Sequence, residues 1–382
     1  MNEPRPPRVF GIDWLEMFVS EAPSVDYSAE GFERRGWWVE RRDYGTKTMA
    51  EMFTLCDKRG YPFIEIRRAP RGLQKHPDSC VYTFGDSYVR LCNLYCYDEN
   101  PMRLMLSFLE REKYRIKKIY RIDLYMDIVR FDSGDIPKKV ARRIVNHTYA
   151  KVNQTNRRTS GADTWTECFD DWISWGAMGS MVSTKFYNKT KEIEDTGMKK
   201  TYILENWRRY GLIDDVTTIR KNGEKVEVWR LEFSIKGNAK GWIWINAKES
   251  EDGARHMIPH SPECYIEKQG VLNALVNLIP YYFKFRKYRE GVKKSNCEEK
   301  VLFKFDDNEA EQGYRLTSAS DAARVRHIEV NDELTALHLL DRAYKRLSGT
   351  EVAPDLQKII GKVFNRVNER ARHTFQKDTD VF

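Results

Sequence analysis

The chain has few cysteines and histidines, and neither type is spaced like a metal site. Its seven cysteines are an odd set, and the only close pair, Cys92 and Cys96, has no second cysteine pair and no histidine nearby. This spacing argues against a zinc site. We interpret the cysteines as reduced, mostly buried thiols of a cytoplasmic protein.

The seven histidines include no His-apolar-His triplet, which would place two metal ligands on one face of a strand. His256 and His260 are four residues apart, but Pro259 between them breaks the helix that would align them. A metal site in this chain is therefore expected to use carboxylates.

Long apolar runs and nucleotide-binding loops are also missing. No stretch approaches 18 apolar residues, and no apolar segment follows a basic start, so neither a membrane span nor a signal peptide is expected. No glycine-rich phosphate loop of the NTPase kind is present, and no nucleotide cofactor is expected.

The composition is that of a globular protein with a basic balance. Apolar residues make up 41% of the 382 residues and aromatic residues 13%, which is ample for a core. The 65 basic and 57 acidic residues give a net charge of +8, which suits a polyanionic partner without proving one.

The order of strand-like and helix-like segments predicts an α+β fold. We expect a central, largely antiparallel sheet built from two diverged β-α-β halves with helices packed on it, plus a small C-terminal helical appendage. The expected boundaries are a disordered segment at 1–8, a main domain at 9–305, a linker at 306–318 and a helical region at 319–382.

The most informative stretch is Lys185 to Glu192. Read as an extended strand, it places Lys185, Tyr187, Lys189 and Lys191 on one face. A row of ammonium groups would lower the pKa of the phenol and hold a phosphate beside it, so Tyr187 could act as a nucleophile. The alternative is a solvated lysine face with one exposed tyrosine.

Two further strands carry carboxylates on a polar face. The segment 120–129 alternates Arg121, Asp123, Tyr125 and Asp127 with apolar residues. Like charges on one face repel unless a cation lies near, and either a divalent ion or Arg121 with neighbouring lysines would satisfy the two aspartates.

The segment 228–236 follows an Asn222-Gly223 hairpin signal and places Arg230, Glu232, Ser234 and Lys236 on one face. Convergence of the three polar faces would create a site for an oxygen-loving metal and phosphate chemistry. Beyond this strand, Lys236, Lys240, Trp242 and Trp244 interleave cations with aromatic rings that could stack on unpaired bases, although a core role is the alternative for the tryptophans.

Four motifs in order resemble the trans-acting replication initiation factors of rolling-circle plasmids, integrative elements and some phages, a group that includes MobT-like relaxases. They are I-D-W-L from Ile12, R-I-D-L-x-x-D from Arg121, G-S-x-x-S-x-K-F-Y-N-K from Gly179 and R-L-E from Arg230, and the resemblance spans about residues 9–305. The aspartate that commonly follows the tyrosine in this family is Asn188 here.

The resemblance implies that the chain nicks one DNA strand at an origin, presented as a single strand or hairpin. Tyr187 would form a 5′-phosphotyrosine and leave a 3′-hydroxyl for a polymerase, with rejoining by the reverse reaction. The implied metal ligands for Mg²⁺ or Mn²⁺ are Asp123, Asp127 and Glu232. Lys185 and Lys189 would stabilise the phosphate. The two arginines of these strands could contact phosphate or instead orient the carboxylates. The full set of further expected phosphate or DNA contacts is Arg121, Arg230, Lys191, Lys236, Lys240 and Trp242.

Two alternatives remain open. A conjugative relaxase would share the chemistry, although residues 1–30 leave no room for the added helix-turn-helix that would favour it. A non-catalytic DNA-binding protein would use the same basic strands only to hold the backbone. The C-terminal helices could form a homodimer, read origin DNA or bind a host helicase or polymerase, and the sequence does not separate these roles.

Overall fold

The computed structural model describes residues 5–71, 85–146, 148–151, 165–169, 171–176, 182–237, 242–249, 255–287, 290–292, 296–306 and 308–318. The chain divides into two compact units, Met1–Leu316 and Thr317–Phe382. The helical region predicted at 319–382 lies outside the described residues.

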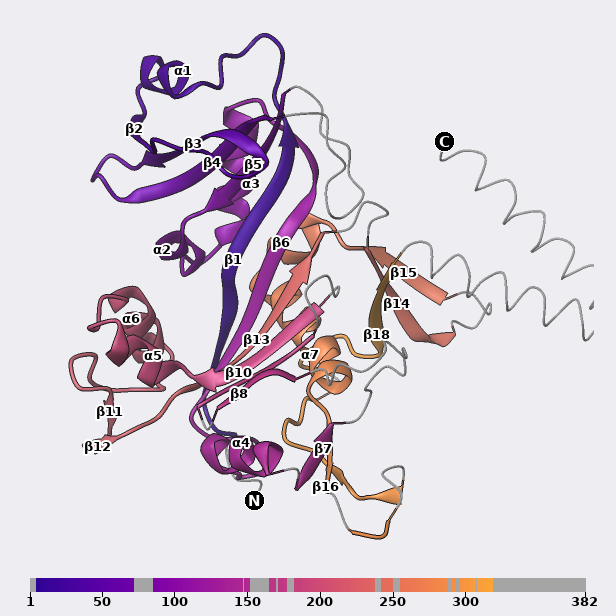
Figure 1. Cartoon of the computed structure of the whole chain (residues 1–382). Helices are drawn as coiled ribbons and strands as arrows, with labels where there is room; N and C mark the ends of the chain where they lie inside the picture. Colours follow the sequence, from indigo (N-terminus) through magenta and orange to yellow (C-terminus); the bar gives the residue numbers. More distant parts are fainter. Residues whose placement is uncertain are drawn as a thin grey trace, which may run out of the picture. The chain divides into compact units, whose positions relative to one another are not determined.

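A ten-stranded sheet forms the centre of the first unit (Figure 1), and its strand order is β2-β3-β4-β5-β1-β6-β13-β10-β9-β8. Every neighbouring pair is antiparallel, which confirms the predicted α+β class. The strands are β1 (Arg8–Ser20), β2 (Trp38–Arg41), β3 (Met49–Cys56), β4 (Pro62–Pro70), β5 (Asp86–Leu91), β6 (Arg115–Ile128), β8 (Trp165–Phe169), β9 (Trp172–Trp175), β10 (Val182–Asn188) and β13 (Trp229–Lys236).

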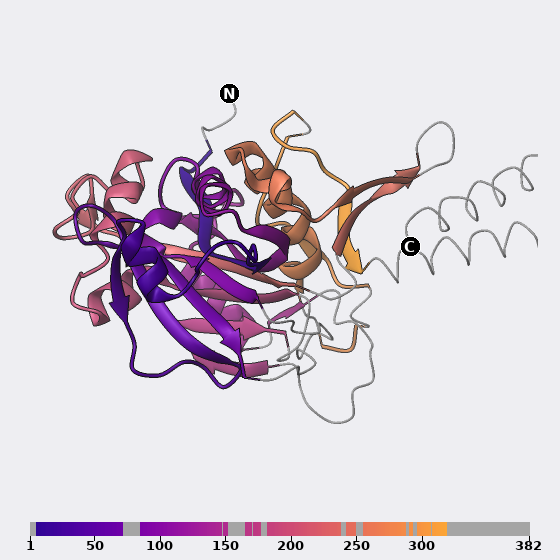
Figure 2. The same cartoon turned by 90° about the horizontal axis from the view of Figure 1, so that it is seen from above.

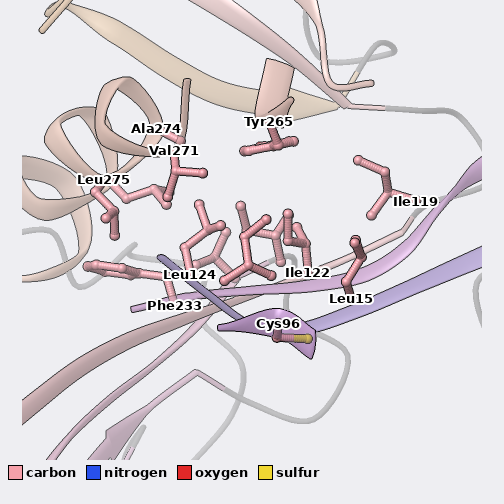
Figure 3. Close-up of a cluster of buried hydrophobic side chains, with 14 of the residues drawn as sticks. Leu15, Cys96, Ile119, Ile122, Leu124, Phe233, Tyr265, Val271, Ala274 and Leu275 are labelled. Carbon is pink, nitrogen blue, oxygen red and sulfur yellow. The ribbon is translucent and has the colours of Figure 1, made fainter. Parts of the chain in front are cut away.

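One face of this sheet is apolar because alternate side chains of β1, β6 and β13 are aliphatic or aromatic. In Figure 3, Val271, Ala274 and Leu275 of α7 (Lys268–Tyr282) lie over strand residues that include Ile122 and Leu124. Helices α1 (Ala29–Arg34) and α3 (Pro101–Arg111) add buried side chains to the same core. Pro101 lies in the first turn of α3, where the missing N–H of proline costs no intrahelical hydrogen bond.

The opposite face is polar and is partly covered by α5 (Lys189–Asp195) and α6 (Thr201–Arg209), which lie across the strands from α7 in Figure 1. Trp207 of α6 is fully buried in this layer with Ile193 of α5. A hairpin of β11 (Arg220–Lys221) and β12 (Glu224–Lys225) follows. Its turn residues Asn222 and Gly223 have φ of 51° and 80°, the left-handed backbone that the predicted Asn-Gly turn requires.

The strand-helix-strand order occurs twice in the chain, as β5-α3-β6 and as β10, α5, α6, β13. The strand pairing differs between the two, because β5 and β6 flank β1 whereas β10 and β13 are direct neighbours. The repetition therefore concerns the order of elements and not their pairing.

Smaller elements surround the sheet, and among the described residues no helix is long and apolar enough to cross a membrane. One three-stranded sheet contains β15, β14 and β18, and another contains β17, β16 and β7. These elements, with the remaining helices, are α2 (Asn93–Cys96), α4 (Pro137–Val145), β7 (Tyr149–Lys151), β14 (Trp242–Glu249), β15 (Arg255–Pro259), η1 (Pro262–Tyr265), β16 (Phe285–Lys287), β17 (Glu299–Lys300) and β18 (Tyr314–Ser318).

Two stretches expected to lack structure make defined contacts. Arg8 begins β1, and both Arg5 and Arg8 form ion pairs with Glu309. Ala310 and Leu316, within the stretch predicted as a linker, are buried. Residues 5–8 and 308–316 therefore pack into the first unit, whereas residues 1–4 lie outside the described part.

Candidate active site on the polar face of the sheet

The three strands singled out in the sequence are neighbours in the order β6, β13, β10, so their polar faces converge. Antiparallel register aligns Asp127 with Arg230, and Arg230 with Tyr187. The next row on the same face aligns Glu232 with Lys185. These strands place a phenol, carboxylates and cations within one small area.

Tyr187 is buried, with 5% of its surface exposed, and both of its polar neighbours are charged. Its hydroxyl donates a 3.0 Å hydrogen bond to Oε2 of Glu232, and Nζ of Lys189 donates to the same hydroxyl at 3.3 Å. The ring stacks on Trp172, with 5.1 Å between centroids. The phenol is thus held in one orientation by a carboxylate, an ammonium group and an indole.

The pKa of Tyr187 moves in the direction opposite to the one predicted from the sequence. Burial, followed by the negative charge of Glu232, raises this pKa well above its usual value, and the nearby cations do not reverse the shift. Without substrate, Tyr187 is therefore a neutral hydrogen-bond donor. Ionisation of the phenol requires its proton to be accepted by a neighbouring base.

The strand predicted to run to Glu192 ends at Asn188, which corrects the expected positions of two lysines. The Asn188 side chain accepts a hydrogen bond from the backbone N–H of Lys191 and caps α5. Lys189 and Lys191 consequently lie in the first turn of a helix rather than on the strand face of Tyr187. Lys189 still reaches the phenol, because its side chain is 3% exposed and turns inward.

The two helical lysines differ in environment. Lys189 forms an ion pair with Glu192, and its pKa is lowered by burial and then by the charge of Arg230. Lys191 is 55% exposed and pairs with Asp171 at 2.6 Å. Only Lys189 belongs to the enclosed site, and Lys191 lies on its outside.

Glu232 links the phenol to a surface cation. Its side chain is 4% exposed, and Oε1 accepts a 2.8 Å hydrogen bond from Nζ of Lys185, which is 30% exposed. One carboxylate oxygen therefore faces Lys185 and the other faces Tyr187. This geometry suits a group that accepts the phenol proton.

Asp123 is buried beside a second arginine. Nε of Arg121 donates to Oδ1 of Asp123 at 2.9 Å and contacts Oγ of Ser234 at 3.2 Å. Burial raises the pKa of Asp123 to about 6, and the negative charge of Glu232 adds to the shift against the opposing effect of Arg121. Arg121 thus orients this carboxylate, one of the two roles expected for it.

Asp127 is occupied by structural partners, which corrects its expected role as a metal ligand. Nε and Nη2 of Arg230 donate to its two oxygens, each at 2.7 Å, and Nε1 of Trp207 donates at 2.7 Å. Both Asp127 and Arg230 are fully buried. Arg230 therefore orients a carboxylate, one of the two roles expected for it.

Arg230 also holds Asp13 and Tyr97, donating to each at 2.8 Å through Nη1. Burial alone would raise the pKa of Asp13, but the guanidinium holds it at about 2. Asp13, the acid of the I-D-W-L motif, therefore supports the site through the hydrogen bond that it accepts from Arg230. Tyr97, Trp172 and Trp207 were not predicted here, and only the strand pattern at Trp172 offered a signal for any of them.

Among the described residues, no three histidine, cysteine, aspartate or glutamate side chains are grouped to hold a metal ion. Asp123 and Glu232 remain as two carboxylates on neighbouring strands, the first held by Arg121 and the second by Lys185 and Tyr187. Mg²⁺ and Mn²⁺ accept oxygen ligands, and Mg²⁺ is commonly bound through one or two carboxylates, water and substrate phosphate. The chemistry of this pair fits such an ion, with fewer protein ligands than the sequence suggested.

The other predicted contacts are dispersed. Lys236 ends β13 and is half-buried, and Lys240 lies outside the described residues. Trp242 begins β14 in the separate three-stranded sheet, and its side chain is outside the described part. Trp244 is buried near His260, which matches the core alternative.

No protein family and no curated relative matches the sequence. Among solved structures, the fold is similar to a rolling circle replication initiator protein from Geobacillus stearothermophilus. The two chains are 12% identical, with a TM-score of 0.42 over 77% of this chain and 93% of that chain. At this level of similarity, the function must be argued from the geometry of the site.

Proposed function

We propose that the protein is a rolling-circle replication initiator that nicks one strand of DNA at a specific origin, using Tyr187 as the nucleophile. The observation that carries this proposal is the Tyr187 hydroxyl held between Glu232 and Lys189, with Asp123 two strands away in the order β10, β13, β6. A buried phenol with a carboxylate acceptor and an ammonium donor is arranged for nucleophilic attack.

The reaction assigns a role to each of these groups. Oη of Tyr187 attacks the scissile phosphorus while its proton passes to Oε2 of Glu232, the oxygen it already contacts. The bond from phosphorus to O3′ breaks, and the released oxygen takes a proton from solvent. The positive charges of Lys189 and Lys185 stabilise the phosphate during the attack. The 5′-phosphotyrosine keeps the strand available for rejoining.

The proposed cation site is Asp123 with Glu232, completed by water and a phosphate oxygen. When bound, Mg²⁺ or Mn²⁺ would supply Lewis-acid polarisation of the scissile phosphate. Arg121 would keep Asp123 pointed toward that position. Asp127 is left out of the proposed ligand set because its partners Arg230 and Trp207 are fully buried with it, whereas Arg121 and Lys185, which hold Asp123 and Glu232, are 31% and 30% exposed.

The main rival is a DNA-binding protein without catalysis. The burial of Tyr187 favours the enzyme, because a backbone-binding strand has no need for a phenol enclosed by a carboxylate and a buried lysine. A conjugative relaxase would use the same residues. The proposed partner in each enzyme role is DNA with an unpaired or hairpin nick site.

The test uses single-stranded and hairpin oligonucleotides that tile the DNA around the protein's own gene. Each is incubated with Mn²⁺ or EDTA and analysed on denaturing gels for protein-linked DNA. Wild type should form an adduct that requires the metal, and Tyr187→Phe should form none. Tyr125→Phe, which alters another buried tyrosine of the same face, is the matched control and should retain the adduct. Binding without any adduct would favour the rival.

A further inference from the structure

The polar face continues past the candidate site onto strands that the proposed chemistry does not use. Register aligns Arg121 with Glu16, Glu16 with Arg90, and Arg90 with Glu65. Arg67 lies two residues beyond Glu65 on the same face of β4. We name Arg67, Arg90 and Arg121 the arginine row.

In this area the acidic side chains are buried and the basic side chains are partly exposed. The side chains of Glu16 and Glu65 are 3% and 7% exposed, whereas those of the arginine row are 17% to 31% exposed. Glu65 accepts a 2.9 Å hydrogen bond from Nη2 of Arg90, and Glu16 pairs with Arg67. Buried carboxylates hold each guanidinium group while part of each arginine side chain is exposed, an arrangement that suits the binding of phosphate oxygens.

Aromatic rings lie between these guanidinium groups. Trp14 on β1 is half-buried, and the guanidinium carbons of Arg90 and Arg121 lie 4.2 Å and 4.6 Å from its ring centroid. The ring centroid of Tyr88, a residue that is only 3% exposed, lies 5.2 Å from the guanidinium carbon of Arg67. A half-buried tryptophan between two guanidinium groups suits a single nucleic-acid strand, which presents phosphates and bases together.

We infer that the arginine row, with Trp14, binds an unpaired DNA segment continuous with the strand attacked by Tyr187. The inference rests on the proposed function for that continuity. Arg90 is on the fourth strand from Tyr187 in the order β10, β13, β6, β1, β5. At about 4.8 Å per strand this is roughly 19 Å, a distance that a few unpaired nucleotides can span. The face would hold the single-stranded flank while the site holds the scissile phosphate.

The first test measures how the affinity for a fluorescent oligo(dT) 20-mer depends on salt. Arg67→Gln with Arg90→Gln removes two phosphate contacts, so the slope of log K against log salt should fall by about 1.4. Arg34→Gln with Arg59→Gln is the control, because these arginines are 67% and 72% exposed and lie outside the row. An unchanged slope in the row variant, or an equal fall in the control, overturns the inference.

The second test needs no substitution and so avoids leaving Glu16 or Glu65 unpaired. Oligo(dT) carrying 5-iododeoxyuridine is photocrosslinked to the wild-type protein, and the linked peptides are mapped by mass spectrometry. Crosslinks at Trp14 or in the strand segments that carry the arginine row support the inference. Crosslinks confined to other segments overturn it, even if the Tyr187 adduct forms. Crosslinks at this face with no adduct under any condition would overturn the proposed nicking function and leave the DNA-binding face standing.

Discussion

The hydroxyl of Tyr187 donates its hydrogen bond to Oε2 of Glu232, 45 residues further along the chain, at 3.0 Å. The other oxygen of Glu232 is held by Lys185. The acceptor that raises the pKa of the phenol in the free protein is therefore also the group placed to receive its proton. The proposed nucleophile is unreactive until a phosphate approaches, which limits side reactions of the free protein.

Glu232→Gln should slow formation of the DNA adduct by about 10²-fold to 10⁴-fold, because the amide cannot accept the proton of Tyr187. The measurement is the single-turnover rate under saturating DNA. Glu227→Gln changes a 38% exposed glutamate just before the same strand and should leave the rate unchanged. Equal rates for Glu232→Gln and wild type would remove Glu232 from the mechanism.

Lys189→Met should reduce the adduct rate by about 10-fold to 10²-fold, because the ammonium group that contacts the phenol oxygen is lost. Lys191→Met, two residues away and 55% exposed, should change it by less than about twofold. The paired comparison separates a buried group of the site from general positive charge. Similar losses in both variants would show that the lysines act only through their net charge.

Asp127→Asn should destabilise the fold by about 3 to 5 kcal/mol, since Arg230 would be left as a buried charge with one anionic partner fewer. Urea unfolding with and without Mn²⁺ measures this effect. The loss should be the same under both conditions, because Asp127 is assigned no metal. A variant of normal stability that no longer binds Mn²⁺ would restore Asp127 as a ligand.

The raised pKa of Asp123 predicts two pH dependences. A carboxyl whose folded-state pKa is about 6, above the unfolded value near 4, costs stability once it ionises. Its contribution to the free energy of unfolding is therefore lost as pH rises from about 4 to about 6. Asp123→Asn should gain stability over wild type across that range, on the order of 2 kcal/mol, and the two should converge at pH 4.

The adduct rate should change with pH in the opposite direction to stability, because a bound cation needs the ionised form of Asp123. The adduct rate at limiting Mn²⁺ should rise as pH increases through about 6, and a higher Mn²⁺ concentration should move the midpoint to lower pH. A midpoint independent of Mn²⁺ concentration would show that Asp123 does not bind the cation.

Much of the site framework could be predicted from sequence because strands with period-two alternation record which side chains share a face. That pattern identified β6, β10 and β13 and the grouping of Tyr187, Glu232 and Asp123. It could not separate Asp123 from Asp127, which occupy equivalent positions on one strand. Their difference arises from Arg230, 103 residues away from Asp127, and from Trp207, 80 residues away.

The placement of Lys189 on the strand, rather than on a helix, was wrong for a reason that the sequence itself contains. Asn188 is a favoured helix cap, and five of the seven residues after it, Lys189–Asp195, are charged. Extending the strand pattern through a capping residue placed two lysines on the wrong element. The direction of the Tyr187 pKa shift, in contrast, required knowledge of burial, because exposed lysines and buried carboxylates act on a phenol with opposite sign.

The most direct test of the central claim is to identify the amino acid that carries the DNA. Adduct formed with Mn²⁺ is digested with nuclease and protease, and tandem mass spectrometry locates the nucleotide remnant. The account predicts a 5′-phosphate ester on Tyr187 and a 3′-hydroxyl on the released strand that a polymerase can extend. A remnant on any other residue, or a released strand that ends in a 3′-phosphate, would contradict it.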